Sequence, residues 1–301
     1  MAELKIGMVG LDTSHAPAFA KCFNKKDHAE HIAGARVAVG YPGGSKDFDL
    51  SINRVQGYTK QLHDEFGVQI VDSPEQVAEQ ADLVFIMTCD GRAHRELLAR
   101  TVKSGKPTFI DKPIATSVAD ATEIFRLAKE HDVPVVSSSS LRYAHTLTEA
   151  LDHCADLGAI SGCDVFGPMA IQPPLPGLFW YGIHSVEIAN RIMGKGCAQV
   201  RATMTENHDV VALKYADGRV ASLHGLRNAH HKFGATIHRE KGVQFVNASE
   251  VKHSYYFSML QVMMSTLPLR KTDIAPEDTL EIVRIVEAAN RARETGEVVH
   301  V

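Results

Sequence analysis

Residues 81–88, with the sequence ADLVFIMT, constrain the fold more than any other segment of the chain. A nearly continuous apolar run of this length is typical of a strand that is buried on both faces of a parallel sheet. Consecutive parallel strands must be joined by a crossover, which is usually a helix. The run therefore predicts that strands and helices alternate on either side of it.

The first half of the chain has this alternation. Strands are predicted at residues 5–9, 35–41, 68–71, 108–110 and 133–138. Helices are predicted up to residue 24, at 55–66, from Ser73, at 94–104 and at 117–130. This βαβα order predicts a doubly wound parallel sheet. Beyond Gly158 the pattern changes to β-rich segments at residues 159–166, 198–205, 210–215, 220–225, 235–239 and 244–247, with helices at 144–154 and 182–193.

The composition limits the possible partners and location. With 301 residues, 45% hydrophobic and 23% charged, the chain can bury two cores. A net charge of −4 without a basic block argues against a nucleic-acid partner. No apolar run approaches the ~20 residues that span a bilayer, and the start of the chain does not resemble a signal peptide. Five scattered cysteines (Cys22, Cys89, Cys154, Cys163 and Cys197) then predict reduced thiols in a cytoplasmic protein with no membrane partner.

The first predicted strand leads into Gly10 and a helix, as at the start of a dinucleotide-binding unit. If Gly10 is the first glycine of G-x-G-x-x-G, then Asp12 and His15 occupy the second and third glycine positions. A carboxylate at Asp12 would repel the pyrophosphate, so its replacement by glycine is expected to tighten cofactor binding. Asp12 or Thr13 can instead cap the helix.

The loop after the second strand bears on the choice between NAD and NADP. An NAD site usually places an acid at the end of this strand, whereas here Tyr41 is followed by Pro42 and the first acid is Asp47. Ser45 and Lys46 could receive a 2′-phosphate, which favours NADP weakly. A solvated loop without a cofactor role is the simpler interpretation.

Asp111, Lys112 and Pro113 directly follow the predicted strand at residues 108–110. Ligands of open parallel sheets gather at the carboxyl ends of the strands, and Pro113 restricts Lys112 to an extended conformation. A lysine held in this way, with a pKa tuned by its surroundings, can exchange a proton with an alkoxide or a carbonyl. The alternative is a loop lysine that is merely paired with Asp111.

Taken together, these features resemble the glucose–fructose oxidoreductase / inositol dehydrogenase / MocA (Gfo/Idh/MocA) family over nearly the whole chain. The matching features are residues 6–10 (IGMVG), Thr88 with His94, the Asp111-Lys112-Pro113 segment in place of Glu-Lys-Pro, Arg142, residues 182–187 (GIHSVE) and the tail at 280–301. The resemblance implies an α/β protein with a Rossmann domain at residues 1–140. A C-terminal α/β domain at 141–301, on an open and largely antiparallel mixed sheet, would bind substrate and mediate oligomerisation.

The resemblance further implies an NAD(P)-dependent dehydrogenase or reductase that transfers a hydride between the nicotinamide and a small sugar-like or polyol-like hydroxy compound. Lys112 and His184 would be catalytic and would manage the hydroxyl proton. Cofactor-binding residues would be Gly10, Asp12, Thr13, Tyr41, Ser45, Thr88, Cys89, His94, Asp111 and Lys112. Substrate-binding residues would be Arg142, Trp180, Tyr181 and His184, which would face Lys112 in one crevice.

Three positions depart from the family pattern. Asp12 and His15 replace glycines, and Trp180 stands where many members have an aspartate four residues before the histidine. An indole cannot orient His184 as a carboxylate would. The departures leave open a second reading, a non-catalytic family member that binds a sugar-like ligand or acts as a regulatory subunit.

Two further expectations concern metals and assembly. His230 and His231 are adjacent and would point to opposite faces of a strand, and no second Cys/His pair has clear ligand spacing, so no metal site is expected. A sheet with helices on one face leaves its other face needing cover, which predicts a homo-oligomer, either a dimer or a tetramer.

Overall fold

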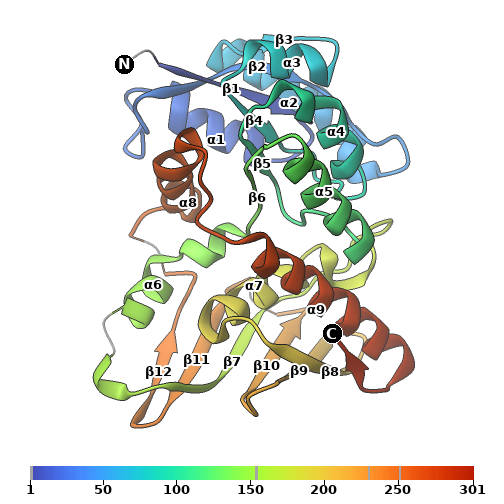
Figure 1. Cartoon of the computed structure of the whole chain (residues 1–301), viewed down its shortest axis with the longest axis vertical. Helices are drawn as coiled ribbons and strands as arrows, with labels where there is room; N and C mark the ends of the chain where they lie inside the picture. The colour runs from blue at the N-terminus through green and yellow to red at the C-terminus, as the bar shows by residue number, and fades with distance from the viewer. Residues whose placement is uncertain (1–2, 153–154, 230, 251) are drawn as a thin grey trace. The chain divides into compact units, whose positions relative to one another are not determined.

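The structure, a computed structural model, describes residues 3–152, 155–229, 231–250 and 252–301 (Figure 1). Cys154 and His230 therefore lie outside the described residues. The chain divides into two compact units. The first consists of Met1–Ala115, Ala119–Ser138 and Tyr256–Pro276, and the second of Thr116–Val118, Ser139–Tyr255 and Glu277–Val301.

The first unit contains the predicted parallel sheet. Its strands are β1 (Leu4–Val9), β2 (Ala35–Tyr41), β3 (Gln69–Ile70), β4 (Leu83–Ile86), β5 (Thr108–Ile110) and β6 (Val135–Val136). Their order is β3-β2-β1-β4-β5-β6, and every neighbouring pair is parallel. All of β4 is buried, as its apolar sequence predicted. The prediction of a doubly wound sheet is confirmed.

Helices connect these strands in sequence order (Figure 1): α1 (His15–Asn24), α2 (Asp49–Phe66), α3 (Pro74–Gln80), α4 (His94–Thr101) and α5 (Val118–Glu130). The first helix packs against the second, and α3 packs against α4. Strand order reverses between β1 and β4, and ligands of such sheets bind at this switch point. α2 begins at Asp49 rather than at residue 55, because its first turn buries Ser51.

Helix α8 (Tyr255–Thr266) was not predicted from the sequence. It buries Met259, Leu260 and Met263, and the ring of Tyr256 packs edge-on against Phe19 of α1 with ring centroids 5.5 Å apart. These contacts place Tyr256–Pro276 in the first unit. The division into a domain at residues 1–140 and a domain at 141–301 stays a prediction, and it does not include this return.

The second unit is built on a seven-stranded sheet with the order β12-β11-β7-β10-β9-β8-β13. The strands are β7 (Ile160–Pro168), β8 (Cys197–Met204), β9 (His208–Tyr215), β10 (Val220–Leu226), β11 (Gly234–Arg239), β12 (Gly242–Val246) and β13 (Val299–His300). Only β7 and β10 pair in parallel, so the sheet is mixed and largely antiparallel, as predicted. The helices of this unit are α6 (His145–Asp152), α7 (Gly182–Met193) and α9 (Pro276–Thr295).

One face of this second sheet is exposed in the single chain. Side chains alternate along β9 between exposed and buried, and α7 packs against β7 and β10. Strand register places Val210, Val220, Val243 and Phe245 on the exposed face, with 44% to 69% of each residue accessible. Apolar side chains in such numbers mark interaction surfaces. This exposed face supports the expectation of a homo-oligomer, which stays a prediction.

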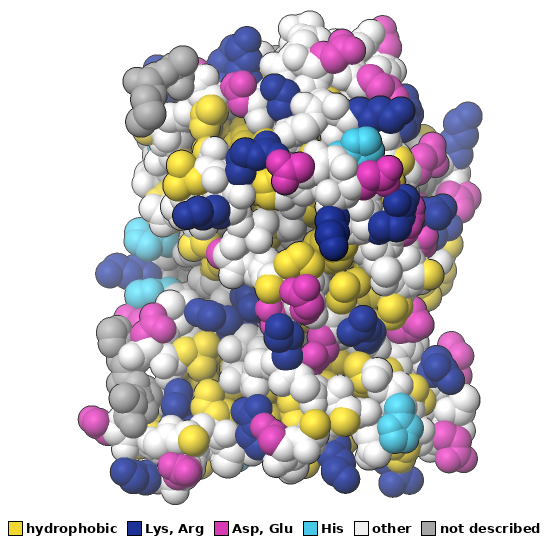
Figure 2. All heavy atoms as spheres, viewed as in Figure 1, with side chains coloured by type: hydrophobic (Ala, Val, Ile, Leu, Met, Phe, Trp, Pro, Cys, Tyr) yellow, Lys and Arg dark blue, Asp and Glu magenta, His cyan; other side chains and the backbone are white. Residues whose placement is uncertain are grey.

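Surface charge, helix length and the cysteines are the structural features that relate to the expected partners and location. On the face shown in Figure 2, acidic and basic side chains are interspersed. Within the described ranges, no helix is long and apolar enough to cross a membrane. Cys22, Cys89, Cys163 and Cys197 are buried and free.

Candidate active site

The predicted cofactor residues of the first unit lie where β1, β2, β4 and β5 end. Gly10 has a φ of +85°, and a Cβ there would lie 2.7 Å from the backbone nitrogen of Thr88, so only glycine fits. The Gly10 N–H donates to the Tyr41 carbonyl at 2.9 Å. The structure thus brings Gly10, Tyr41 and Thr88 together at the switch point.

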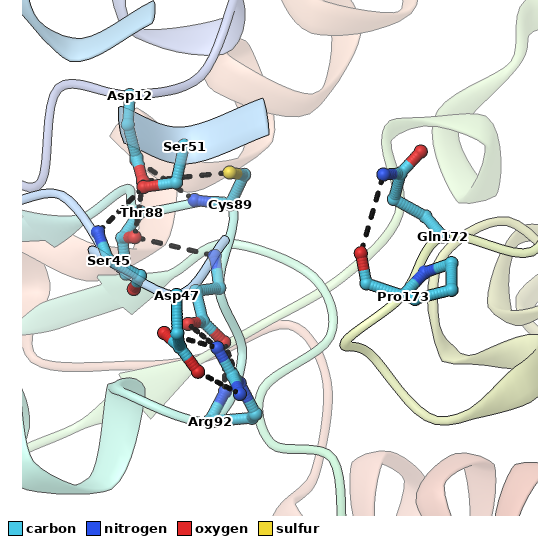
Figure 3. Close-up of polar contacts among 10 residues, drawn as sticks. Asp12, Ser45, Asp47, Ser51, Thr88, Cys89, Arg92, Gln172 and Pro173 are labelled. Atoms are coloured by element: carbon cyan, nitrogen blue, oxygen red, sulfur yellow. Dashed lines mark hydrogen bonds and ion pairs between the residues drawn. The ribbon is translucent and has the colours of Figure 1, made fainter. Parts of the chain in front are cut away.

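Asp12 is the centre of a buried hydrogen-bond network (Figure 3). Its carboxylate accepts from the Thr88 hydroxyl at 2.9 Å and from the Cys89 N–H at 3.0 Å. The Ser51 hydroxyl also donates to Asp12, and Ser51 accepts from the Ser45 N–H at 2.8 Å. One carboxylate therefore joins the glycine loop, the segment after β4 and the first turn of α2.

This geometry corrects two expectations about Asp12. Its side chain is fully buried and hydrogen-bonded to Thr88 and Cys89, so it is not the exposed carboxylate at the glycine turn that the repulsion argument assumed. It also does not cap α1, whose N-cap is Ser14 and has no side-chain capping bond. Thr13 contributes only a long contact, with its hydroxyl oxygen 3.4 Å from the His15 nitrogen.

The start of α1 retains free backbone donors. In the described part of the chain, the N–H groups of Thr13 and Ser14 have no acceptor. Such donors, together with the positive end of the helix dipole, favour a phosphate group. The residues at this end of α1 therefore fit the pyrophosphate of a dinucleotide, although the second and third fingerprint glycines are absent.

Arg92 fastens the loop after β2 to the segment after β4 (Figure 3). Its guanidinium donates to Asp90 at 2.7 and 2.8 Å and to Asp47 at 2.9 and 3.1 Å. Burial acts to raise the pKa of Asp90, but hydrogen bonds from Arg92 and the Ser45 side chain outweigh it and lower that pKa. Two carboxylates and one guanidinium give this group of residues a net charge of −1.

His94 lies beneath the segments that follow β4 and β5. Its side chain is fully buried, with Nε2 2.9 Å from the Thr88 carbonyl oxygen and Nδ1 2.9 Å from that of Pro113. The histidine therefore holds the two segments together from within the protein, and it supports Lys112 through Pro113. The His94 ring is fully buried, and its predicted role in cofactor binding stays a prediction.

Lys112 is 9% exposed, so it is buried rather than solvated, and both its proton-transfer role and its pairing with Asp111 stay predictions. Burial lowers its pKa, against the opposing charge of Asp111. Asp111 accepts from the Lys112 N–H at 2.8 Å and from Nδ1 of His15 at 2.6 Å. Burial would raise the pKa of Asp111, but the charges and hydrogen bonds of His15 and Lys112 hold it below its usual value.

His184 occupies the first turn of α7 in the second unit. Its Nδ1 lies 2.7 Å from the hydroxyl oxygen of Ser139, which is fully buried and accepts from the Leu141 N–H at 3.2 Å. The rings of Tyr181 and Phe233 stand edge-on to the imidazole, with centroids 5.4 and 5.5 Å away. Ser139 thus contacts Nδ1 of His184 directly.

The other predicted substrate residues have different surroundings. Arg142 donates from Nη1 to Glu187 at 3.2 Å and to Asn190 at 3.1 Å. Both acceptors are side chains of α7. Trp180 and Tyr181 are half-buried and pack together with centroids 6.0 Å apart. Lys112 and His184 belong to different units, and the single crevice stays a prediction.

One group of side chains in the described ranges has metal-like geometry. Donor atoms of Cys22, His28 and Glu30 lie within 4.8 Å of one another. Burial raises the pKa of Cys22 to about 11, and Nδ1 of His28 accepts from the Glu30 N–H at 3.0 Å. A protonated thiol and an occupied imidazole nitrogen are poor starting ligands. The expected lack of a metal site stays a prediction.

Sequence reasoning missed three residues that shape these sites, Ser51, Arg92 and Ser139. A signal existed for two of them. Arg92 lies between Asp90 and His94 in the segment after an apolar strand, and Ser139 belongs to a run of four serines after β6. Nothing in the sequence near Ser51 indicates that its hydroxyl reaches a residue 39 positions away.

Comparisons with known proteins agree with this geometry. Residues 4–139 match the family model of the GFO_IDH_MocA oxidoreductases, described as having an NAD-binding Rossmann fold. Inositol 2-dehydrogenase 2 of Mycolicibacterium vanbaalenii is 20% identical over 237 residues, 76% of this chain and 65% of that protein. Inositol 2-dehydrogenase of Paracoccus denitrificans is 23% identical over 258 residues, 76% of this chain and 69% of that protein. The chain thus spans about two thirds of the length of these curated relatives.

The fold is shared with a solved structure along almost the whole chain. Scyllo-inositol dehydrogenase of Lactobacillus casei, with bound NAD(H) and scyllo-inositol, has a TM-score of 0.83 at 16% identity, with 99% of each chain covered. Together with the parallel sheet, the glycine turn and the Asp111-Lys112-Pro113 segment, the comparisons show that residues 4–139 match the Gfo/Idh/MocA family of NAD-binding oxidoreductases.

Proposed function

We propose that this protein is an NAD-dependent dehydrogenase that oxidises a small polyol or reduces the matching ketone. The observation that carries the proposal is Lys112, a buried lysine with a lowered pKa at the end of β5, in the same unit as the free N–H groups at the start of α1. Perturbed titratable groups beside a ligand-binding edge are typical of active sites. The inositol dehydrogenases among the relatives support a polyol as the substrate class.

Lys112 supplies the proton transfer in this proposal. Nicotinamide, when bound, accepts or donates the hydride. Burial lowers the pKa of Lys112, which makes its free amine more abundant and so favours proton exchange with the substrate. Pro113 and the buried His94 fix the backbone around it, so that its position is reproducible.

We assign His184 the second role, that of holding the substrate hydroxyl. Its ring needs a fixed tautomer for this, and Trp180 supplies no carboxylate at the position that does so in many family members. Ser139 supplies a contact in its place, because its hydroxyl lies 2.7 Å from Nδ1 of His184. Ser139 is therefore a positioning residue for His184.

Ser139→Ala is expected to lower kcat about 10-fold and to alter the pH profile of kcat, since the ring loses its orienting partner. Ser138→Ala is the matched control, because Ser138 is also buried but contacts Met259 instead. Ser139→Cys keeps a donor of similar size and should recover part of the activity. Steady-state kinetics from pH 6 to 10 provide the measurement, and equal profiles for both alanine variants would exclude the orienting role.

The cofactor is proposed to be NAD rather than NADP. Of the two residues considered for a 2′-phosphate, Ser45 and Lys46, the first has its donors in use, since the Ser45 N–H binds Ser51 and its side chain binds Asp90. Asp47 and Asp90 flank Arg92 and leave a net negative charge near the loop after β2. A 2′-phosphate is repelled by this arrangement, whereas ribose hydroxyls can donate to Asp47.

Titration of the purified protein with NADH and NADPH, followed by nicotinamide fluorescence, tests the proposed function. NADH is expected to bind at least several-fold more tightly than NADPH. Asp47→Asn should reduce this difference in affinity, because it removes one charge that repels the 2′-phosphate. Tighter NADPH binding would implicate Lys46 and restore the preference for NADP. Saturable binding of neither cofactor at millimolar concentration would rule out a dehydrogenase.

A further inference from the structure

His15 occupies the fingerprint position at which a glycine allows a helix to pack closely on the sheet. In this chain the imidazole reaches from the start of α1 to the end of β5, and its Nδ1 lies 2.6 Å from Asp111 Oδ2. The two residues are 96 positions apart. The side chain of Asp111 is 4% exposed and that of His15 is 18% exposed.

The imidazole is held in place by more than this ion pair. The ring stacks on Phe19 at an interplanar angle of 8°, with centroids 5.9 Å apart, and it contacts Tyr256 of α8 at 5.0 Å. Among the described residues, nothing hydrogen-bonds to Nε2 of His15. The partly exposed ring can therefore exchange protons with solvent through Nε2 while Nδ1 stays on Asp111.

Asp111 lies between two basic side chains. Oδ2 accepts from His15, Oδ1 accepts from the backbone of Lys112, and the charge of Asp111 acts on the Lys112 ammonium. The titratable groups that also face this region are Cys89 and Asp90 after β4, Asp12 in the glycine loop, and Tyr256 on α8. Cys89, Asp90 and Asp12 are hydrogen-bonded to partners of their own.

We propose that the charge on His15 controls the protonation of Lys112 through their shared carboxylate, Asp111. An unshared Asp111 carboxylate favours the ammonium form of the buried lysine. A protonated His15 neutralises that carboxylate, so the ammonium loses support and the free amine becomes more abundant. Uptake of a proton from solvent at His15 thus favours release of a proton from Lys112, and the two bases titrate as a coupled pair.

The inference deepens the proposed function, because it rests on Lys112 being the proton-transfer group, but its test needs no substrate. Lysines are labelled with acetic anhydride between pH 5 and pH 10, and the rate at each lysine is measured by peptide mass spectrometry. Only the free amine reacts, so the rate at Lys112 reports its protonation. Lys103 is exposed and serves as the internal reference in every sample.

His15→Gln keeps a polar side chain but cannot carry charge. At a pH low enough for His15 to be charged in the wild type, Lys112 should react about 3- to 10-fold more slowly in this variant than in the wild type. The difference should vanish at a pH at which His15 is neutral in the wild type, because residue 15 then carries no charge in either protein. His63→Gln, an exposed change on α2, is the matched control and should leave the rate at Lys112 unchanged.

The wild type alone gives a second test that does not depend on the folding of a variant. Coupling to His15 predicts two inflections in the profile of Lys112 against pH, whereas an independent lysine gives one. A single inflection, or equal rates in the wild type and in a folded His15→Gln protein, would overturn the inference. If His15 and Lys112 titrate as a coupled pair but no polyol is turned over, the inference stands and the proposed function is refuted. If a polyol is turned over but the two residues titrate independently, the proposed function stands and the inference is refuted.

Discussion

Lys112→Met is expected to lower the turnover of a polyol substrate by about 10² to 10⁴, with little change in the affinity for NADH. Methionine retains most of the stem of the side chain and removes only the ammonium. A group that transfers a proton in the transition state affects kcat, whereas a group that only binds substrate affects KM. Steady-state kinetics and cofactor titration separate these two effects.

Stability supplies the second measurement on this variant. Lys112 is 9% exposed, so its ammonium is desolvated, and its removal leaves Asp111 still paired with His15. The midpoint of thermal unfolding is therefore expected to change little or to rise. Lys106→Met is the matched control, because Lys106 is the other lysine that precedes a proline but is more exposed. Turnover within threefold of the wild type would assign Lys112 a structural role.

The fold could be read from the sequence wherever local patterns decide it. Residues 81–88 predicted a buried strand, and β2, β5 and α7 have the predicted bounds, because periodicity and glycine turns act over short distances. Helix α8 was not predicted because its apolar residues do not form one clear face at helical spacing. Its burial depends on packing against Phe19 and Ser138, which are far away in the chain. Its membership of the first unit follows from tertiary contacts alone.

The candidate site was predictable as a set of positions but not as a set of contacts. Gly10, Thr88 and Asp111 lie at strand ends, which the alternation of strands and helices locates. The partners of Asp12 and Asp111 are 39 to 96 residues away in the chain, at Ser51, Thr88 and His15. Charge repulsion at Asp12 was inferred from residue type alone, and the direction of a side chain depends on donors that only the folded chain brings near it.

Asp12→Gly is consequently expected to weaken NADH binding and to destabilise the protein, which is the opposite of the result expected from the sequence. The buried carboxylate accepts from Ser51, Thr88 and Cys89, and glycine leaves these donors without their acceptor. Hydrogen bonds to a charged group contribute about 1.5–3 kcal/mol each and are not additive, so a loss of about 3 kcal/mol in the free energy of unfolding is expected. Urea denaturation gives this value directly.

Weaker binding follows from the same loss, because the network fixes the loop that carries the Thr13 and Ser14 donors. Asp12→Asn keeps the shape and one acceptor oxygen, and should fall between the wild type and Asp12→Gly in both measurements. Asp27→Asn, an exposed change in the turn after α1, controls for the loss of charge alone. If Asp12→Gly bound NADH more tightly than the wild type, the carboxylate would face the pyrophosphate in the complex, and the network would have to open when the cofactor binds.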